Sequence, residues 1–212
     1  MMEEKMEMKG PAYRILTERL MLRCWNPEDA EMLQPVIDDN LEHLRAWMPW
    51  AMHEPQTVEA KARRIRGFRA AFDEDRDFGY GILSRDGGRV LGGTGLHPRI
   101  GPGGVEIGYW IRRDEEGRGL VAEATRAIVR AAFELHGVRR VEIRCDPANA
   151  RSAAIPARLG FTHEGTLRHN QLDSDDRPRD TMVWAILDTE YRAGPIASFP
   201  IEAFDALGRR VI

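Results

Sequence analysis

The sequence predicts a domain of the mixed α/β class, in which helices lie between strands and antiparallel strand pairs lie at the ends of the sheet. At its centre, an amphipathic helical pattern at residues 120–136 separates strand patterns at 105–112 and 138–145. Two later strand patterns, at 161–172 and 181–187, form a closing antiparallel pair. Helices between central strands, with hairpins at both ends, are typical of a mixed sheet in an α/β or α+β domain.

The elements before the central unit follow from local signals. Residues 18–25 alternate in polarity around Leu20 and Leu22, which predicts a strand. The next four residues, NPED, supply an N-cap Asn, a Pro for the first helical position and acids for the first turn. The other early elements are that helix up to about residue 39, an irregular or briefly helical segment rich in Trp and Met at 44–52, a basic helix at 57–75, and strands at 78–84 and 89–97 joined by the turn RDGG.

The central helix is the clearest helical pattern in the chain. Gly137 ends it, and a short helix at 150–159 ends in the same way at Gly160. Between them, Val141, Ile143 and Cys145 form the apolar face of the strand at 138–145. The apolar face of the central helix consists of Leu120, Ala124, Ile128, Ala131 and Leu135.

Length and composition indicate one domain. The chain has 212 residues, of which 42% are hydrophobic and 31% are charged, as in ordinary soluble proteins. We expect residues 1–12 to be frayed and residues 13–187 to form the domain. Residues 188–212 form a C-terminal tail for which the sequence predicts no element and no role.

Charge and cysteine content restrict the function. The chain holds 31 Lys and Arg against 34 Asp and Glu, a formal net charge of −3, which argues against a nucleic-acid partner. Two cysteines make no disulfide framework, so we expect a reducing, cytoplasmic setting. No apolar run is long enough for a bilayer, and the charged N-terminus lacks a signal core, so we expect no membrane association. We also expect no metal.

The most informative motif is the segment EGRGLV at 116–121, which opens the central helix. Gly117 and Gly119 let main-chain N–H groups approach an anion, and the helix N-terminus favours negative charge. This combination predicts a phosphorylated ligand. Two alternatives remain: a turn that only allows tight packing, and a dinucleotide fingerprint that would use Glu142. A dinucleotide domain normally begins with this unit, whereas here the unit starts after residue 105.

Further motifs flank the Gly turn. They are TERLMLR at 17–23, WMPW at 47–50, EIGYWI at 106–111, AEA at 122–124 directly after the turn, DPANARS at 146–152, LGF at 159–161 and EG at 164–165. With these motifs the chain resembles the GNAT N-acetyltransferase superfamily, and within it the RimJ/RimL branch, which acetylates protein N-termini or small amines. The resemblance covers roughly residues 16–187, and several linked motifs in order are more specific than any one of them.

The resemblance implies a twisted mixed sheet that splays open between the strands at 105–112 and 138–145. It implies acetyl-CoA as co-substrate, wedged into the opening, with its pyrophosphate on main-chain N–H groups of the Gly turn. The acetyl group would pass directly to a primary amine in a ternary complex, and related enzymes often form homodimers. The residues implied in acetyl-CoA binding are Trp110, Ile111, Arg112, Glu116, Gly117, Arg118, Gly119, Leu120, Val121, Asn149 and Ser152.

The resemblance also implies catalytic residues. Glu106 matches the catalytic Glu of the superfamily and is the first candidate for the general base, a role that His97 could share or replace. A main-chain N–H near Trp110 or Ile111 would bind the thioester carbonyl oxygen. Asn149 would hold the pantetheine or a water, and Ser152 would protonate or hydrogen-bond the thiolate, although both residue types also cap helices.

Some positions depart from the family pattern. Glu116 stands where Gln or Arg is usual, Pro156 stands where many members carry a Tyr acid, and Gln171 stands where some carry a Glu. The alternative function is therefore an acyl-CoA-binding module with little or no turnover. An acyl-enzyme on Cys145 is a weaker alternative, because that residue continues an apolar face and a buried, inert thiol fits better.

The acceptor site is predicted from aromatic residues near the motifs. A set of apolar side chains in a Pro-interrupted segment is able to form the wall of a cleft, although each of them alone fits ordinary core. The acceptor is either a peptide N-terminus or a small amine, and the sequence leaves both open. The predicted substrate-binding residues are Trp47, Trp50, Met52, His97, Tyr109 and Gln171.

Overall fold

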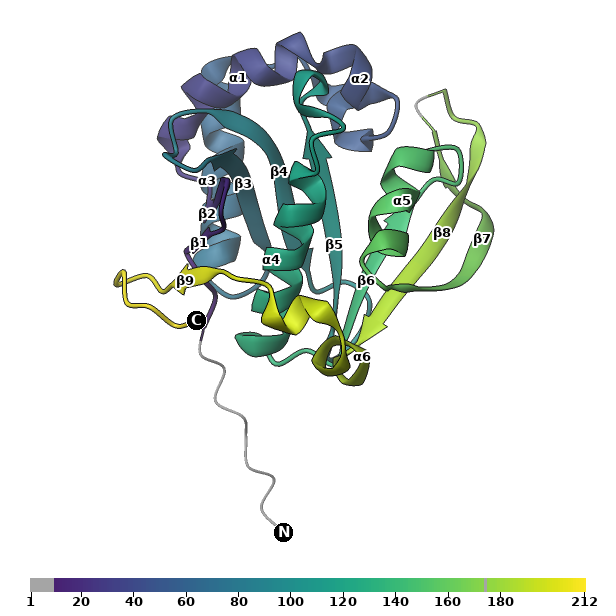
Figure 1. The fold of residues 1–212 in the computed structure, drawn as a ribbon. Coiled ribbons are helices and arrows are strands. Elements are labelled where there is room, and N and C mark those ends of the chain that lie inside the picture. Colours follow the sequence, from purple (N-terminus) through teal and green to yellow (C-terminus); the bar gives the residue numbers. More distant parts are fainter. Residues whose placement is uncertain (1–9, 174) are drawn as a thin grey trace.

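The computed structural model describes residues 10–173 and 175–212, which form a nine-stranded sheet flanked by helices (Figure 1). The spatial order of the strands is β7-β8-β6-β5-β4-β3-β2-β1-β9. Among the described strands, β5 and β6 form the one parallel pair. The fold is therefore the predicted mixed sheet. The strands are β1 (Arg14–Leu16), β2 (Leu20–Cys24), β3 (Phe78–Ser84), β4 (Val90–His97), β5 (Gly104–Ile111), β6 (Arg140–Cys145), β7 (Thr162–Leu172), β8 (Pro178–Leu187) and β9 (Glu202–Phe204).

The helices follow the predicted pattern, and the C-terminal tail adds one helix, α6, that the sequence did not predict. The predicted helices correspond to α1, α3, α4 and α5, and the Trp- and Met-rich segment forms the short α2 and a 3-10 turn at Pro49–His53. In Figure 1, α4 crosses in front of the central strands and α3 lies behind them. The helices are α1 (Ala30–Asp39), α2 (Leu41–Arg45), α3 (Val58–Asp73), α4 (Leu120–Glu134), α5 (Ala150–Arg158) and α6 (Asp188–Ala193).

Helix α4 is held by its apolar face. All five residues predicted for that face, from Leu120 to Leu135, are buried in the main core cluster. Burial of such side chains contributes about 1.5–3 kcal/mol for each large aliphatic one. The helix begins at Gly119, whose φ of 77° lies in the left-handed region that glycine adopts without strain. The start of α4, and with it the Gly turn, is therefore fixed against the centre of the sheet.

The sheet opens between β5 and β6, as predicted. Their pairing runs from Gly104–Arg140 to Ile107–Ile143 and then stops, although β5 continues to Ile111. The main-chain groups on that side of β5 beyond Ile107 therefore have no strand partner. This opening leads to the cavity described below.

The chain termini are more ordered than the sequence predicts. Residues 1–9 of the segment expected to be frayed lie outside the described residues, but Ala12 is buried, and its carbonyl accepts a 2.8 Å hydrogen bond from Tyr80. In the tail, Tyr191 of α6 is buried and stacks on Phe133 of α4. Strand β9 pairs with β1 at the edge of the sheet. The tail is thus part of the folded domain.

Candidate active site

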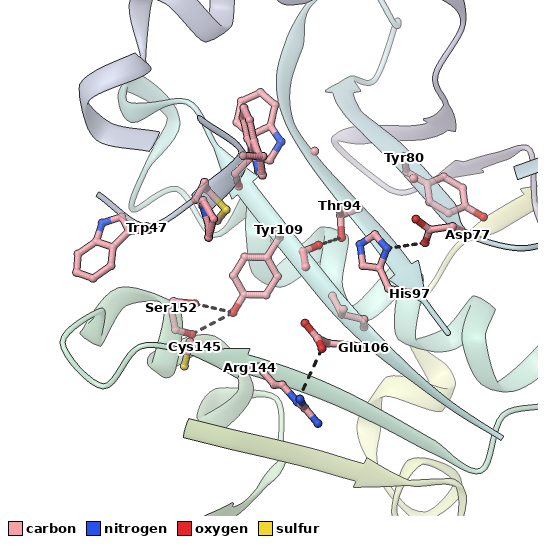
Figure 2. Close-up of a pocket in the computed structure, with 18 of the residues that line it drawn as sticks. Trp47, Asp77, Tyr80, Thr94, His97, Glu106, Tyr109, Arg144, Cys145 and Ser152 are labelled. Atoms are coloured by element: carbon pink, nitrogen blue, oxygen red, sulfur yellow. Dashed lines mark hydrogen bonds and ion pairs between the residues drawn. The ribbon is translucent and has the colours of Figure 1, made fainter. Parts of the chain in front are cut away.

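A cavity of about 800 Å³ lies beside the opening of the sheet. Its walls come from α1, the 3-10 turn at Pro49–His53, α3, β4, β5, β6, α5 and the β7–β8 hairpin. Figure 2 shows labelled side chains from β4, β5, β6 and α5 that line it. Nine of the predicted site residues line it: Trp47, Trp50, His97, Glu106, Tyr109, Trp110, Asn149, Ser152 and Gln171.

Met52 does not belong to this cavity, which corrects the prediction. Its side chain is 44% exposed, and the residue is absent from the lining. The preceding Ala51 is fully buried. With three residues per turn in a 3-10 helix, the residue that follows an inward-facing one points elsewhere. Met52 therefore faces solvent.

The Gly turn forms a second part of the site, outside the cavity lining. Gly117 and Gly119 have φ of 73° and 77°. Within the described part of the chain, the amide hydrogens of residues 117–122 donate to no protein acceptor. Several unpaired N–H groups at the positive end of a helix dipole make an anion-binding site. The turn therefore has the donors that the sequence predicted.

Neighbouring side chains compensate the charge of Glu116. Its carboxylate accepts a hydrogen bond from Arg151 of α5, and Nε2 of His43 lies 3.4 Å away. Glu116 therefore does not present a free negative charge to a ligand on the turn. Arg118 pairs with the buried Glu115. The departure of Glu116 from the family pattern is thus matched by a partner that the sequence did not reveal.

The buried carboxylate of Glu123 links the Gly turn to the segment directly before β2. Glu123, in the first turn of α4, is 6% exposed. It accepts hydrogen bonds from the Thr17 hydroxyl at 2.6 Å and from the Arg19 amide at 3.0 Å, and its other oxygen pairs with the Arg19 guanidinium. Arg19 also donates to the carbonyl of Arg118 at 3.0 Å. One network thus links the segment before β2 to the Gly turn.

The open edge of β5 presents two amides. The Arg112 amide donates to Leu91 on β4 at 2.8 Å. Because successive N–H groups of a strand point to opposite sides, the Trp110 amide also faces β4, and those of Tyr109 and Ile111 face the opening. The Trp110 side chain contacts Trp50 edge-to-face. The Arg112 guanidinium donates hydrogen bonds to the Asp114 carboxylate. Of the two amides named from the sequence, Ile111 thus fits the oxyanion role and Trp110 does not.

Glu106 lies in the cavity as predicted, but it is already paired. Its residue is 9% exposed, and Arg99 donates to both carboxylate oxygens, through Nε at 3.1 Å and through Nη2. Arg144 lies 3.8 Å away on β6 (Figure 2). Arg99 therefore occupies one acceptor position on each oxygen and holds the carboxylate in a fixed orientation.

Tyr109 and Ser152 meet at the start of α5. The Tyr109 hydroxyl lies 3.1 Å from the carbonyl oxygen of Ser152 and 3.2 Å from its Oγ (Figure 2). Burial raises the pKa of Tyr109, and the hydrogen bond with Ser152 opposes that rise in part. Asn149 accepts a 3.0 Å bond from the Ser152 amide and thus caps α5, which leaves its NH₂ group for other partners. A phenol from β5 therefore lies beside Ser152, although Pro156 replaces the usual helix Tyr.

Cys145 lines the same cavity as a free, buried thiol. Burial raises the pKa of its thiol, so the thiolate is disfavoured at neutral pH. This agrees with the predicted inert thiol. Gln171 lies at the exposed rim of the cavity, on β7.

The family is decided by comparison with known proteins. A family model described as an acetyltransferase (GNAT) domain matches residues 19–162 of the chain. The chain belongs to the GNAT acetyltransferase family. Membership in the GNAT family makes it an acyltransferase, as the motifs predicted.

Individual relatives support the RimJ/RimL-like branch of the GNAT family. The chain is 26% identical over 189 residues to the [ribosomal protein uS5]-alanine N-acetyltransferase of Escherichia coli (strain K12), covering 87% of the chain and 95% of that protein. It is 30% identical over 145 residues to a Bacillus subtilis (strain 168) protein named probable N-acetyltransferase YjcK, covering 67% and 80%. The solved structure of RimL, a ribosomal L7/L12 alpha-N-protein acetyltransferase in complex with coenzyme A, superposes with a TM-score of 0.75 at 20% identity, over 82% of this chain and 97% of that one.

The GNAT assignment removes the dinucleotide alternative. A dinucleotide-binding fold needs a mostly parallel sheet, whereas the described strands contain one parallel pair.

No helix within residues 10–173 and 175–212 combines the length and apolar character needed to cross a bilayer.

Proposed function

We propose that this GNAT protein transfers an acetyl group from acetyl-CoA directly to the N-terminal amine of a peptide or protein. The observation that supports this most strongly is the combination of unpaired amides at residues 117–122 with a sheet opening that adjoins the cavity. Two of the proteins named above, the uS5-alanine N-acetyltransferase and RimL, are named for ribosomal-protein substrates, which favours a protein acceptor over a small amine. A ribosomal acceptor would place the reaction in the cytoplasm.

The residues present fit acetyl-CoA. The amides of residues 117–122 would bind the diphosphate, and Arg19 and Arg118 place two guanidinium groups beside the turn. The NH₂ group of Asn149 would hold the pantetheine between the separated strands. The remaining lining, including Trp47 and Trp50, would receive the acceptor peptide.

The chemistry requires stabilisation of two negative charges. As the amine attacks, charge develops on the carbonyl oxygen, where the amides of Tyr109 and Ile111 are free to donate. As the C–S bond breaks, charge develops on sulfur, where the Ser152 hydroxyl would donate a hydrogen bond. Tyr109 would orient that hydroxyl through the 3.2 Å contact between the two oxygens. The thiolate then takes a proton from water, either directly or through Ser152, which regains a proton from water as it gives up its own.

An acceptor assay tests the proposed function. Purified protein is incubated with acetyl-CoA and with peptides that begin with Ala or Ser, and thiol release and product mass are measured. Control peptides carry a blocked N-terminus, with and without an internal Lys. We expect thiol release and a gain of one acetyl group on the unblocked peptides alone. Tight CoA binding without thiol release above background would instead favour the acyl-CoA-binding module.

The thiolate contact predicts a moderate loss of turnover. Ser152→Ala should lower kcat about 10- to 100-fold, because a hydrogen bond to a charged group is worth about 1.5–3 kcal/mol. Tyr109→Phe should lower it less, since it acts through Ser152. Tyr191→Phe is the matched control, because it removes a hydroxyl bonded to Glu134 outside the cavity. Equal kcat values for Ser152→Ala and Tyr191→Phe would remove Ser152 from the mechanism.

A further inference from the structure

His97 and Asp77 form a pair on the floor of the cavity. Nδ1 of His97, at the end of β4, lies 2.5 Å from a carboxylate oxygen of Asp77, directly before β3 (Figure 2). A carboxylate accepts but does not donate, so the bond requires the proton on Nδ1. In a neutral ring, Nε2 is then a free acceptor. This is the arrangement that orients a histidine base.

Two glycines place Nε2 at the point where the sheet opens. Gly95 and Gly108 face each other across β4 and β5, and Gly108 is the first residue of β5 beyond the pairing with β6. A Cβ added at Gly95 would lie 2.7 Å from Nε2, and one at Gly108 would lie 3.6 Å from it. The imidazole therefore rests over the glycine pair, at the point where β5 leaves β6.

The charged groups near His97 come from several elements. Asp77 precedes β3, Glu106 is the cross-strand neighbour of His97 on β5, Arg99 follows β4 and Arg144 lies on β6. Both arginines lie against Glu106: Arg99 donates to both carboxylate oxygens, and Arg144 lies 3.8 Å away. Asp77 is the charged group that bonds to His97 itself. Of the two predicted base candidates, His97 has a ring nitrogen that bonds to no described residue, whereas both oxygens of Glu106 already accept hydrogen bonds from Arg99.

We infer that His97, oriented by Asp77, is the general base of the proposed transfer and that Glu106 is not. The inference rests on the proposed function. As the amine nitrogen bonds to the acetyl carbon, its proton passes to Nε2, and the C–S bond breaks to release the CoA thiolate. The thiolate takes a proton from water while the Ser152 hydroxyl donates a hydrogen bond to it. Asp77 stabilises the imidazolium. His97 is partly exposed, so its proton can return to solvent.

Three substitutions separate the roles, with an alanine-initiated peptide as the acceptor. His97→Asn keeps a donor for Asp77 but lacks Nε2, so kcat should fall about 100-fold while the KM for acetyl-CoA stays within about twofold. Asp77→Asn should lower kcat about 10-fold or more. An Asn side chain can donate to Nδ1, so the tautomer of His97 that carries its proton on Nε2 becomes available. Glu106→Gln should lower kcat less than His97→Asn does.

A spectroscopic measurement tests the pair without turnover. In long-range ¹H–¹⁵N spectra of the ligand-free protein, His97 should show the Nδ1-protonated tautomer, and Asp77→Asn should change it. The inference is overturned if the wild type is active and His97→Asn retains its kcat, if Glu106→Gln is the more damaging variant, or if His97 is protonated on Nε2 instead. A wild type inactive toward every amine would reject the proposed function itself, and with it this role.

Discussion

Replacement of Gly119 by Asp should weaken CoA binding about 1,000-fold, whereas replacement by Asn should weaken it about 10-fold. Asn and Asp both tolerate the left-handed conformation that Gly119 adopts at φ 77°. A Cβ at this position would meet only Arg19, at 3.7 Å, so the fold has room for either side chain. The two variants therefore differ mainly in charge.

The size of the difference follows from electrostatics. A carboxylate about 4 Å from one phosphate charge costs about 4 kcal/mol at an effective dielectric constant of 20, which corresponds to roughly 1,000-fold in Kd. Asn adds only bulk beside the diphosphate, for which we expect a cost of about 1 kcal/mol in binding free energy, roughly 10-fold in Kd. Isothermal titration with CoA measures both Kd values, and melting curves without ligand should agree between the variants. Equal affinity of Asp and Asn variants would show that the diphosphate binds elsewhere.

Replacement of Glu123 by Ala should lower the free energy of unfolding by about 3 kcal/mol. The buried Thr17 hydroxyl and the partly buried Arg19 amide would lose their acceptor, and an unsatisfied buried donor costs about 1–3 kcal/mol. The ion pair itself adds less, because the Arg19 side chain is 47% exposed. Arg19→Met is thus the matched control, with an expected loss of about 1 kcal/mol.

Urea denaturation followed by circular dichroism measures both losses. In thermal melts, Glu123→Ala should lower Tm by about 6–12 °C for a chain of this size. It should also weaken CoA binding, since Arg19 would no longer hold the carbonyl of Arg118. A Glu123→Ala protein as stable as Arg19→Met would contradict the role of the buried network.

Local pattern was sufficient for the elements that form the centre of the fold. Helix α4 is long and strictly amphipathic, so its position follows from periodicity alone. Strands β1 and β9 have three residues each, too few for alternation to be recognised, and they are stabilised by pairing with each other. The tail was unassigned because its packing depends on residues distant in sequence, such as Phe133 of α4, on which the buried Tyr191 stacks.

The site was predictable in its composition and not in its connections. The glycines of the turn and the aromatic residues of the cavity are visible in the sequence as motifs. The pairs that decide their roles join positions far apart: Glu123 with Thr17, Asp77 with His97 and Arg151 with Glu116. No local periodicity encodes such contacts, so Glu106 was preferred as the base while its pairing with Arg99 was unknown.

The most direct measurement is a crystal structure of the protein with CoA. We predict that diphosphate oxygens lie within hydrogen-bond distance of amide nitrogens in residues 117–122 and that the pantetheine runs between β5 and β6 toward His97. Ordered CoA with its diphosphate away from the Gly turn, or outside the opening of the sheet, would contradict the proposed acetyl-CoA site.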